Sequence, residues 1–387
     1  MRAPNEIDFW RGFALATIFI NHVPGIFYER FTHRNVSLSD SAEMFVFLAG
    51  WSLRFVVTSP GQPLSAFRLV LRLVGRAVVI YAAQILITVI AIALIAAASI
   101  YFDAPPLLEW HNAAAVFEEP VATHVGLVLL SHQLGYFNIL PLYVVLMTAA
   151  PVIALLDRAS PWLLLAASLA LYVYALFGGI NLPTWPVEGR WFLDPLTWQL
   201  IFVLGFLIAS PNGGLGALVR RYHRVLRLVA IPVVAAGGLA AWFHYSPDPL
   251  RVPDPKLFFM FDKTFLSPAR LLHAIALVGL FAGSFRTIAR ALPPLGRYLS
   301  MLGRNSLNVF CVGSVLSLAG QIARFEYGGG IGTDTVVIII GIVALGVTGW
   351  VSEWRERLRA RQGPQPSPSS SPQVSSPPVS SRRAQPT

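Results

Sequence analysis

Long apolar stretches recur along the chain and alternate with short polar connections. A helix that crosses a bilayer needs about 20 mostly apolar residues, or fewer when its ends are buried among other helices. Ten stretches fit this description, and they cover residues 10–29, 43–59, 73–101, 136–157, 161–179, 195–210, 225–243, 265–285, 304–323 and 333–352. The pattern predicts an all-α, polytopic integral membrane bundle of about ten transmembrane helices.

The composition supports this prediction. The chain has 387 residues, of which 55% are hydrophobic and 12% are charged, whereas a soluble domain carries about 25% charged residues. The first apolar run contains His22 and lacks a small-residue cleavage signature, which indicates a retained helix and not a signal peptide. Cys311 is the only cysteine, which excludes an intramolecular disulfide and a cysteine-cluster metal site. We expect no metal and no bound cofactor.

The charges of the connections predict the orientation. Residues 60–76, 211–227 and 286–304 are rich in arginine, whereas residues 102–135 carry four acids and neither lysine nor arginine. Basic loops stay on the cytoplasmic side, so with ten spans both termini are cytoplasmic. The net charge of +10 follows from the same rule, and we expect no nucleic-acid partner.

Composition also divides the chain into two parts. Residues 1–355 form the membrane-embedded domain. Residues 356–387 form a cytoplasmic tail in which Pro, Ser, Gln and Arg predominate from Gly363 onward. Such a sequence has almost nothing to bury, and it predicts disorder and no catalytic role.

A few polar groups lie in or against the apolar stretches. Each costs roughly 2.5–3.5 kcal/mol at membrane depth, so such groups indicate function. His22 lies about 16 Å along the first helix from Arg11, just before Pro24 and Gly25, where we expect the helix to open and free backbone N–H groups for a developing oxyanion. Asp40 and Glu43 begin the second span. Acids there cap a helix and complement its dipole, but either one could also orient the His22 imidazole, as the acid of a triad does.

More polar residues enter spans from the same side. These are His132, Asp262, Lys263, Arg270 and His273. Arg270 and His273 are three residues apart and therefore share a helical face, and a cation there suits an anionic or carbonyl-bearing ligand. A further group at the start of the sixth predicted span consists of Asn181, Trp185, Trp191, Asp194, Trp198 and Gln199. Its two interpretations are an interfacial aromatic belt and a platform for sugar rings.

Arginines gather at the opposite, cytoplasmic side. Arg68, Arg72 and Arg76 recur every four residues and so follow one helical face. This row fits phosphate groups, and it fits the positive-inside rule equally well. Arg11 and Arg54, which lie within predicted spans, are candidate substrate-binding residues as well. Motifs for a phosphate loop, a serine nucleophile elbow, a zinc pair and a Rossmann fold are absent.

Several segments together resemble the OpgC family, a branch of the acyltransferase-3 type of multi-spanning enzymes. They are Asp8–Gly12, Asn21–His22, Ser39–Gly50, His132–Gln133, Ile139–Tyr143, Asn181–Pro186, Trp198–Gln199, Asp262–Thr264, Leu271–His273 and Ser306–Cys311. The resemblance keeps the family's order to about residue 323. The chain departs from the family pattern at Asn21, where Asp is expected, and at Ala49, where Ser is expected.

The resemblance implies a function. OpgC proteins add succinyl groups to osmoregulated periplasmic glucans, so we expect an inner-membrane acyltransferase that draws acyl-CoA, for example succinyl-CoA, from the cytoplasm. The acceptor is then a periplasmic glucan or other glycan. The family's histidine falls on His22 and its acidic motif on Asp40 and Glu43. Our hypothesis is that His22 acts as the general base. The alternatives are a secondary transporter of an acyl or sugar anion and a non-catalytic scaffold.

Overall fold

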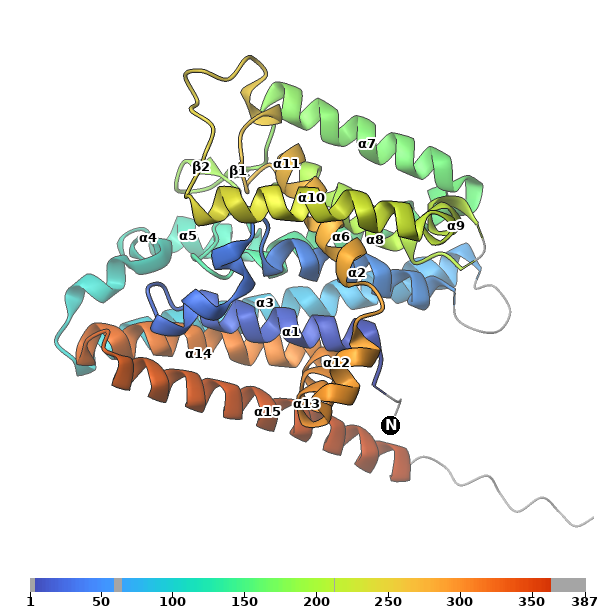
Figure 1. Cartoon of the computed structure of the whole chain (residues 1–387). Coiled ribbons are helices and arrows are strands. Elements are labelled where there is room, and N and C mark those ends of the chain that lie inside the picture. The colour runs from blue at the N-terminus through green and yellow to red at the C-terminus, as the bar shows by residue number, and fades with distance from the viewer. Residues whose placement is uncertain (1–3, 59–64, 212, 363–387) are drawn as a thin grey trace, which may run out of the picture.

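The computed structural model describes residues 4–58, 65–211 and 213–362, and it is mainly helical (Figure 1). The first half contains α1 (Glu6–Asn21), α2 (Ser41–Val57), α3 (Ala66–Tyr101), α4 (Ala114–Glu118), α5 (Pro120–Val128), α6 (Ile139–Ala159) and α7 (Pro161–Gly178). The second half contains α8 (Pro195–Ile208), α9 (Gly214–Arg221), α10 (His223–Trp242), α11 (Pro268–Phe281), α12 (Phe285–Ala291), α13 (Pro293–Arg304), α14 (Ser306–Tyr327) and α15 (Ile331–Gln362).

Short elements connect these helices. They are the 3₁₀ segments η1 (Phe27–Phe31), η2 (His33–Val36), η3 (Pro105–Asn112) and η4 (Lys256–Phe258), with the antiparallel strands β1 (Pro183–Thr184) and β2 (Gly189–Arg190).

The long helices are those of a membrane protein. Within the described residues, α3, α6, α7, α10, α14 and α15 are long and apolar enough to cross a bilayer. The pair α11 and α12, bent by 57° at a short break, would make a seventh span. The other predicted spans correspond to the shorter helices α1, α2 and α8. The fold class is therefore confirmed as all-α and membrane-type, and the count of ten spans and the orientation of the termini stay predictions.

Two predicted boundaries are wrong. The first span was expected to reach residue 29, but α1 ends at Asn21 because Pro24 cannot continue a helix and Gly25 has a positive φ of 72°. The tail was expected to begin at residue 356, but α15 continues to Gln362. Residues 363–387, on which the prediction of disorder falls, lie outside the described residues.

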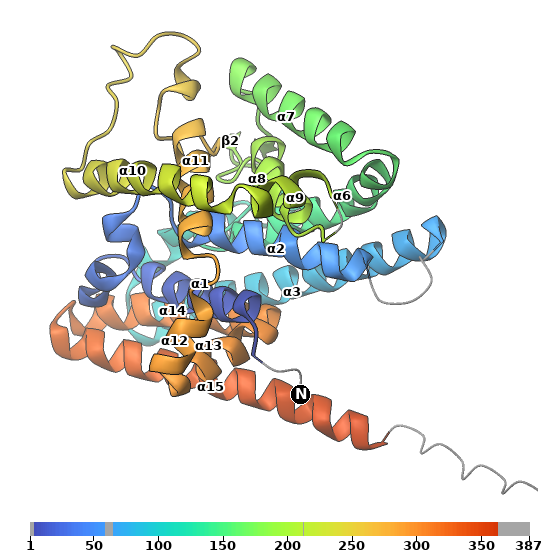
Figure 2. The same cartoon turned by 45° about the vertical axis from the view of Figure 1, so that its right-hand side comes forward.

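The shorter helices α1, α2 and α8 lie inside the bundle, and the longer ones surround them (Figures 1 and 2). α2 packs against α8, α1 against α13, and α3 against α6. The side chains of Trp198, Phe202 and Phe206 on α8 are fully buried. The long outer helices instead expose Leu, Val and Ile side chains, as helices in contact with lipid do.

Two ends of the bundle matter for function. At one end, α1 finishes and α2, α8 and α11 begin; we call this the His22 end. At the other, α1, α3 and α14 begin, and Arg11, Arg76 and Ser306 line a common pocket; we call this the Arg76 end.

Candidate functional site

His22 lies in the turn directly after α1, outside the helical segment. Its ring packs against Tyr136, with ring centroids 5.1 Å apart. Nδ1 of His22 is buried and has no hydrogen-bond partner among the described residues. Burial, reinforced by the nearby positive charge of Lys263, lowers the pKa of His22 to about 3. The imidazole is therefore neutral at pH 7, as a general base must be.

The start of α2 places two carboxylates at the same end. Asp40 precedes the helix and accepts a hydrogen bond from the main-chain N–H of Ala42, while Glu43 accepts one from the N–H of Asp40. This reciprocal arrangement is a capping box. The expectation that Asp40 caps the helix is confirmed.

Each carboxylate also binds a cation, Lys263 from the segment before α11 and Arg270 from the first turn of α11. Nζ of Lys263 lies 2.5 Å from an oxygen of Asp40. The guanidinium of Arg270 donates to Glu43 from Nε at 2.8 Å and from Nη2 at 2.5 Å. Glu43 is fully buried, so its charge depends on Arg270. We call these four residues the ion-pair network.

The network changes the role expected of the acids. A triad acid holds the histidine ring through a direct hydrogen bond. The hydrogen bonds recorded for Asp40 and Glu43 instead go to their capping partners and to the two cations. Nδ1 of His22 stays without a partner among the described residues, so the acids act on His22 only through the electric field of the network.

α11 contributes a second side chain to the same region. Nδ1 of His273 lies 2.8 Å from Oγ of Ser39, the residue before Asp40. Arg270 and His273 thus both reach the segment that begins α2, as their three-residue spacing predicts. His273 is buried and supports the segment that carries the acids.

The turn after His22 is fully hydrogen-bonded. Arg324 of α14 donates to the carbonyls of Pro24 and Gly25 and pairs with Asp334 of α15 at 2.7 Å. Asp334 in turn accepts from the N–H of Phe27 at 2.7 Å. We call Arg324 and Asp334 the clamp.

The main-chain N–H groups of this turn have acceptors too. Pro24 has no N–H group, and the others from His22 to Phe27 all donate to oxygens within the protein. The acceptors, in chain order of the donors, belong to Ile18, Ile20, Glu29, Val23 and Asp334. The expectation that the turn frees backbone donors for a developing oxyanion is therefore wrong.

Several of the predicted binding residues make hydrogen bonds that stabilise the fold. Asp194 caps α8 through the N–H groups of Leu196 and Thr197. The indole of Trp198 is fully buried and donates to the carbonyls of Lys263 and Thr264. A buried indole offers no face to a sugar ring, so the platform interpretation is wrong for Trp198. Its contact instead fixes the main chain that carries Lys263.

Other candidates also have structural contacts. Gln199 exchanges hydrogen bonds with Ser168 on α7. Asp262 caps a turn through the N–H of Phe265 and does not pair with its neighbour Lys263. Nε2 of His132 lies 3.0 Å from the carbonyl oxygen of Asn112. Trp185, next to strand β1, is 46% exposed and is the member of the proposed platform with an accessible ring.

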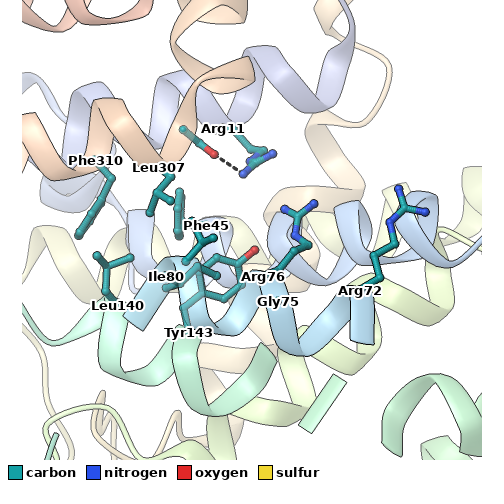
Figure 3. Close-up of a pocket in the computed structure, with 12 residues that line it drawn as sticks. Arg11, Phe45, Arg72, Gly75, Arg76, Ile80, Leu140, Tyr143, Leu307 and Phe310 are labelled. Atoms are coloured by element: carbon teal, nitrogen blue, oxygen red, sulfur yellow. Dashed lines mark hydrogen bonds between the residues drawn. The ribbon is translucent and has the colours of Figure 1, made fainter. Parts of the chain in front are cut away.

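A pocket of about 350 Å³ lies at the Arg76 end (Figure 3). Arg11, Arg72 and Arg76 line one part of it, and the other part is formed by apolar and aromatic side chains. The latter include Phe45, Ile80, Leu140, Tyr143 and Phe310. The pocket thus combines a cationic region with an apolar one, a pairing that suits a ligand with phosphate groups and a less polar arm.

The remaining arginines of the prediction lie elsewhere. Arg68 is exposed and does not line the pocket. Arg54 is buried, and its guanidinium pairs with Asp157 at 2.6 Å and lies over the ring of Phe206. The expectation that Arg54 binds substrate is not supported, because its charge is neutralised within the bundle.

Sequence reasoning missed Tyr136, His111, Gln321, Arg324 and Asp334. Oε1 of Gln321 lies 2.7 Å from Nε2 of His111, and its amide nitrogen donates to the carbonyl of His22. One signal was available, because Gln321 is a polar residue within an apolar span. Nothing in the spacing of His111 or Tyr136 connects them with His22.

Comparison with known proteins places the chain in a family. Across the described ranges, no group of three or more His, Cys, Asp or Glu side chains is placed to hold a metal ion. No curated protein and no solved structure matches the chain significantly. The family model described as OpgC protein matches residues 3–357, nearly the whole chain. The chain therefore belongs to the OpgC family.

Proposed function

We propose that the protein is an O-acyltransferase of the bacterial inner membrane, which transfers a succinyl group from cytoplasmic acyl-CoA to hydroxyls of a periplasmic glucan. Membership of the OpgC family implies a glucan-modifying, acyltransferase-like role. The orientation that follows from the basic loops puts the Arg76 end in the cytoplasm and the His22 end in the periplasm.

One observation carries the proposal. At the His22 end, a neutral imidazole has a buried nitrogen without a protein partner, and the cation Lys263 acts on it electrostatically. A base for a hydroxyl group and a cation for a developing oxyanion are what acyl transfer to an alcohol requires.

The chemistry is direct transfer. His22 takes the proton of the sugar hydroxyl as the hydroxyl oxygen attacks the thioester carbonyl; a C–O bond forms and the C–S bond breaks. The imidazolium then returns its proton to the departing thiolate. Base assistance of this kind contributes about 10²–10⁴-fold.

Lys263 is the best-placed donor for the oxyanion. Its side chain is 31% exposed, and an ammonium has three donors, of which Asp40 takes one. Arg270 is 11% exposed and already binds Glu43, so its role is to keep Glu43 and the start of α2 in place. Lys263, which also acts electrostatically on His22, suits the free carboxylate of a succinyl group as well.

The pocket at the Arg76 end is the proposed donor site. Its arginines would bind the CoA phosphates, and its apolar part would hold the arm that bears the thioester. From Arg11 to His22 the arm has to span about 16 Å along α1. The donor thus enters from one side of the membrane, and its acyl group is used at the other.

Reconstitution tests the proposal. Purified protein in proteoliposomes receives acyl-CoA on the side of the Arg76 end and a labelled glucan on the side of the His22 end. We expect CoA release together with acylated glucan, and loss of both in His22→Ala at equal protein abundance. Accumulation of unchanged labelled solute inside the vesicles would indicate a transporter and contradict the proposal. Mass spectrometry of periplasmic glycans from a deletion strain identifies the acyl group and the acceptor.

A further inference from the structure

The ring of His22 needs a support other than a carboxylate. Nδ1 of His22 has no hydrogen-bond partner among the described residues, and the nearest acids bind cations. The other contacts of His22 come from α14 and from the loop before α6. Gln321 holds the carbonyl oxygen of His22 at 2.5 Å, and Tyr136 packs against the ring.

The contacts of Gln321 determine its amide orientation. The carbonyl of His22 can only accept, so the amide NH₂ of Gln321 must face it. The amide oxygen therefore faces Nε2 of His111 at 2.7 Å. Because that oxygen can only accept, Nε2 of His111 must carry the proton, and the neutral ring has its lone pair on Nδ1.

Tyr136 lies between the two imidazoles. Its ring centroid is 5.1 Å from that of His22 and 5.3 Å from that of His111. The main chain holds this arrangement, since Gly135 donates to the carbonyl of His111 at 2.9 Å. A Cβ at Gly135 would lie 3.1 Å from Nδ1 of His111, so the glycine leaves room for the ring.

We propose that Gln321 and His111 are positioning residues of the site: Gln321 fixes the main chain of His22 and the proton of His111 on Nε2, and the His111–Tyr136 pair fixes the His22 ring. This inference rests on the proposed function for its effect on rate. Its geometric part concerns the tautomer of His111 and stands apart from the reaction.

These contacts take the place of the acid that orients the histidine in a catalytic triad. A hydrogen-bonded carboxylate would orient the ring and also attract the proton to it. Tyr136 packs against the ring and Gln321 holds its main chain, and neither adds negative charge at His22. A neutral His111 also avoids a second positive charge beside the imidazolium that forms during the reaction.

Two substitutions of Gln321 test the proposal. Gln321→Leu removes both hydrogen bonds, and Gln321→Glu keeps the shape but sets a carboxylate oxygen against the carbonyl of His22. We expect kcat to fall about 100-fold in each, the size of effect that a small misplacement of a catalytic group has. The KM for acyl-CoA should stay within about twofold, because the donor pocket lies at the other end of the bundle.

Gln84→Leu is the matched control. Gln84 is a buried amide on α3 whose side chain donates to Thr88, far in sequence from the site. It should keep wild-type kcat, and the variants should be compared at equal folded fraction by thermal unfolding. A wild-type kcat in Gln321→Leu would overturn the proposal.

Nitrogen-15 NMR of labelled histidine supplies a readout that does not depend on turnover, with His111→Gln assigning the signal. The wild type should show His111 protonated on Nε2, and Gln321→Leu should show a mixture of tautomers. A wild-type signal protonated on Nδ1 would overturn the proposal. If the wild type transfers no acyl group, the proposed function fails, and the spectra still decide the tautomer.

Discussion

Arg270 donates two hydrogen bonds to a single carboxylate oxygen of Glu43, which is completely buried. The pair joins the first turn of α11 to the first turn of α2. Breaking a buried pair leaves a charge without compensation, which costs far more than the pair contributes over an apolar replacement.

Arg270→Gln should therefore destabilise the protein by about 3–5 kcal/mol, measured as loss of thermal stability in detergent. Arg251→Gln is the control, because Arg251 is 87% exposed and pairs with the half-exposed Asp248; there we expect about 0–1 kcal/mol. Equal shifts in the two variants would show that Glu43 does not depend on Arg270.

The pKa of His22 predicts the pH dependence of the rate. An unperturbed histidine loses its basic form below pH 6.5, whereas burial and Lys263 lower the pKa of His22 to about 3. The neutral base is therefore present at every pH above about 3. We expect kcat/KM, which reports the free enzyme, to show no histidine-type decline as pH falls from about 8 to about 5.

The same shift makes stability depend on pH in a defined direction. The unfolded chain binds a proton at His22 below pH 6.5 and the folded protein does not, so this group opposes folding increasingly as pH falls. As the pH falls from 6.5 to 4, the His22→Gln variant should therefore lose less stability than the wild type. A half-maximal kcat/KM at about pH 6.5 in the wild type would contradict both expectations, because it would show an unshifted pKa of His22 in the free enzyme.

The pocket arginines should govern donor affinity. Arg76→Gln and Arg72→Gln each remove a guanidinium from the pocket lining, and we expect the KM for acyl-CoA to rise about tenfold in each, the loss of one charge-assisted contact. Arg68→Gln serves as the control because it lies on the same helix outside the pocket. A rise as large in Arg68→Gln would indicate general surface charge as the cause.

Gly237 should tolerate no side chain. A Cβ there would lie 2.1 Å from Cδ2 of His273, so the methyl group would push the ring from Ser39. We expect Gly237→Ala to cost about 1–3 kcal/mol through overpacking and to lower activity, read as thermal stability and kcat. Gly279→Ala is the control: nothing lies within 4 Å of a Cβ there, and this variant should be neutral or slightly more stable.

Patterns that act within one helix were readable from the sequence. The length of the apolar stretches predicted the helices, Asp40 and Glu43 predicted the cap of α2, and three-residue spacing put Arg270 and His273 on one face. The order of motifs gave the family. The helices, the cap and the shared face depend on neighbours in the chain, whose geometry is fixed once a helix forms.

Contacts between segments far apart in the chain could not be predicted from the sequence. The sequence could not say that Lys263 binds Asp40 and not Asp262, or that Arg54 pairs with Asp157 in the bundle interior. Trp198 has the composition of a sugar platform, and only its burial excludes that role. His111 enters the site because the segment that follows α3 returns to α14, and no local pattern encodes that return.

The clamp makes α14 and α15 necessary for the site, although these two helices supply none of the candidate catalytic groups. Arg324 and Asp334 hold the chain immediately beyond His22 from a point about 300 residues later in the sequence. A shortened protein that stops before α14 would keep the histidine, both acids and both cations. It would nevertheless lack Arg324 and Asp334, which hold the main chain next to His22 and so place the imidazole relative to those groups. We therefore expect the protein to become active only after α14 and α15 have been synthesised.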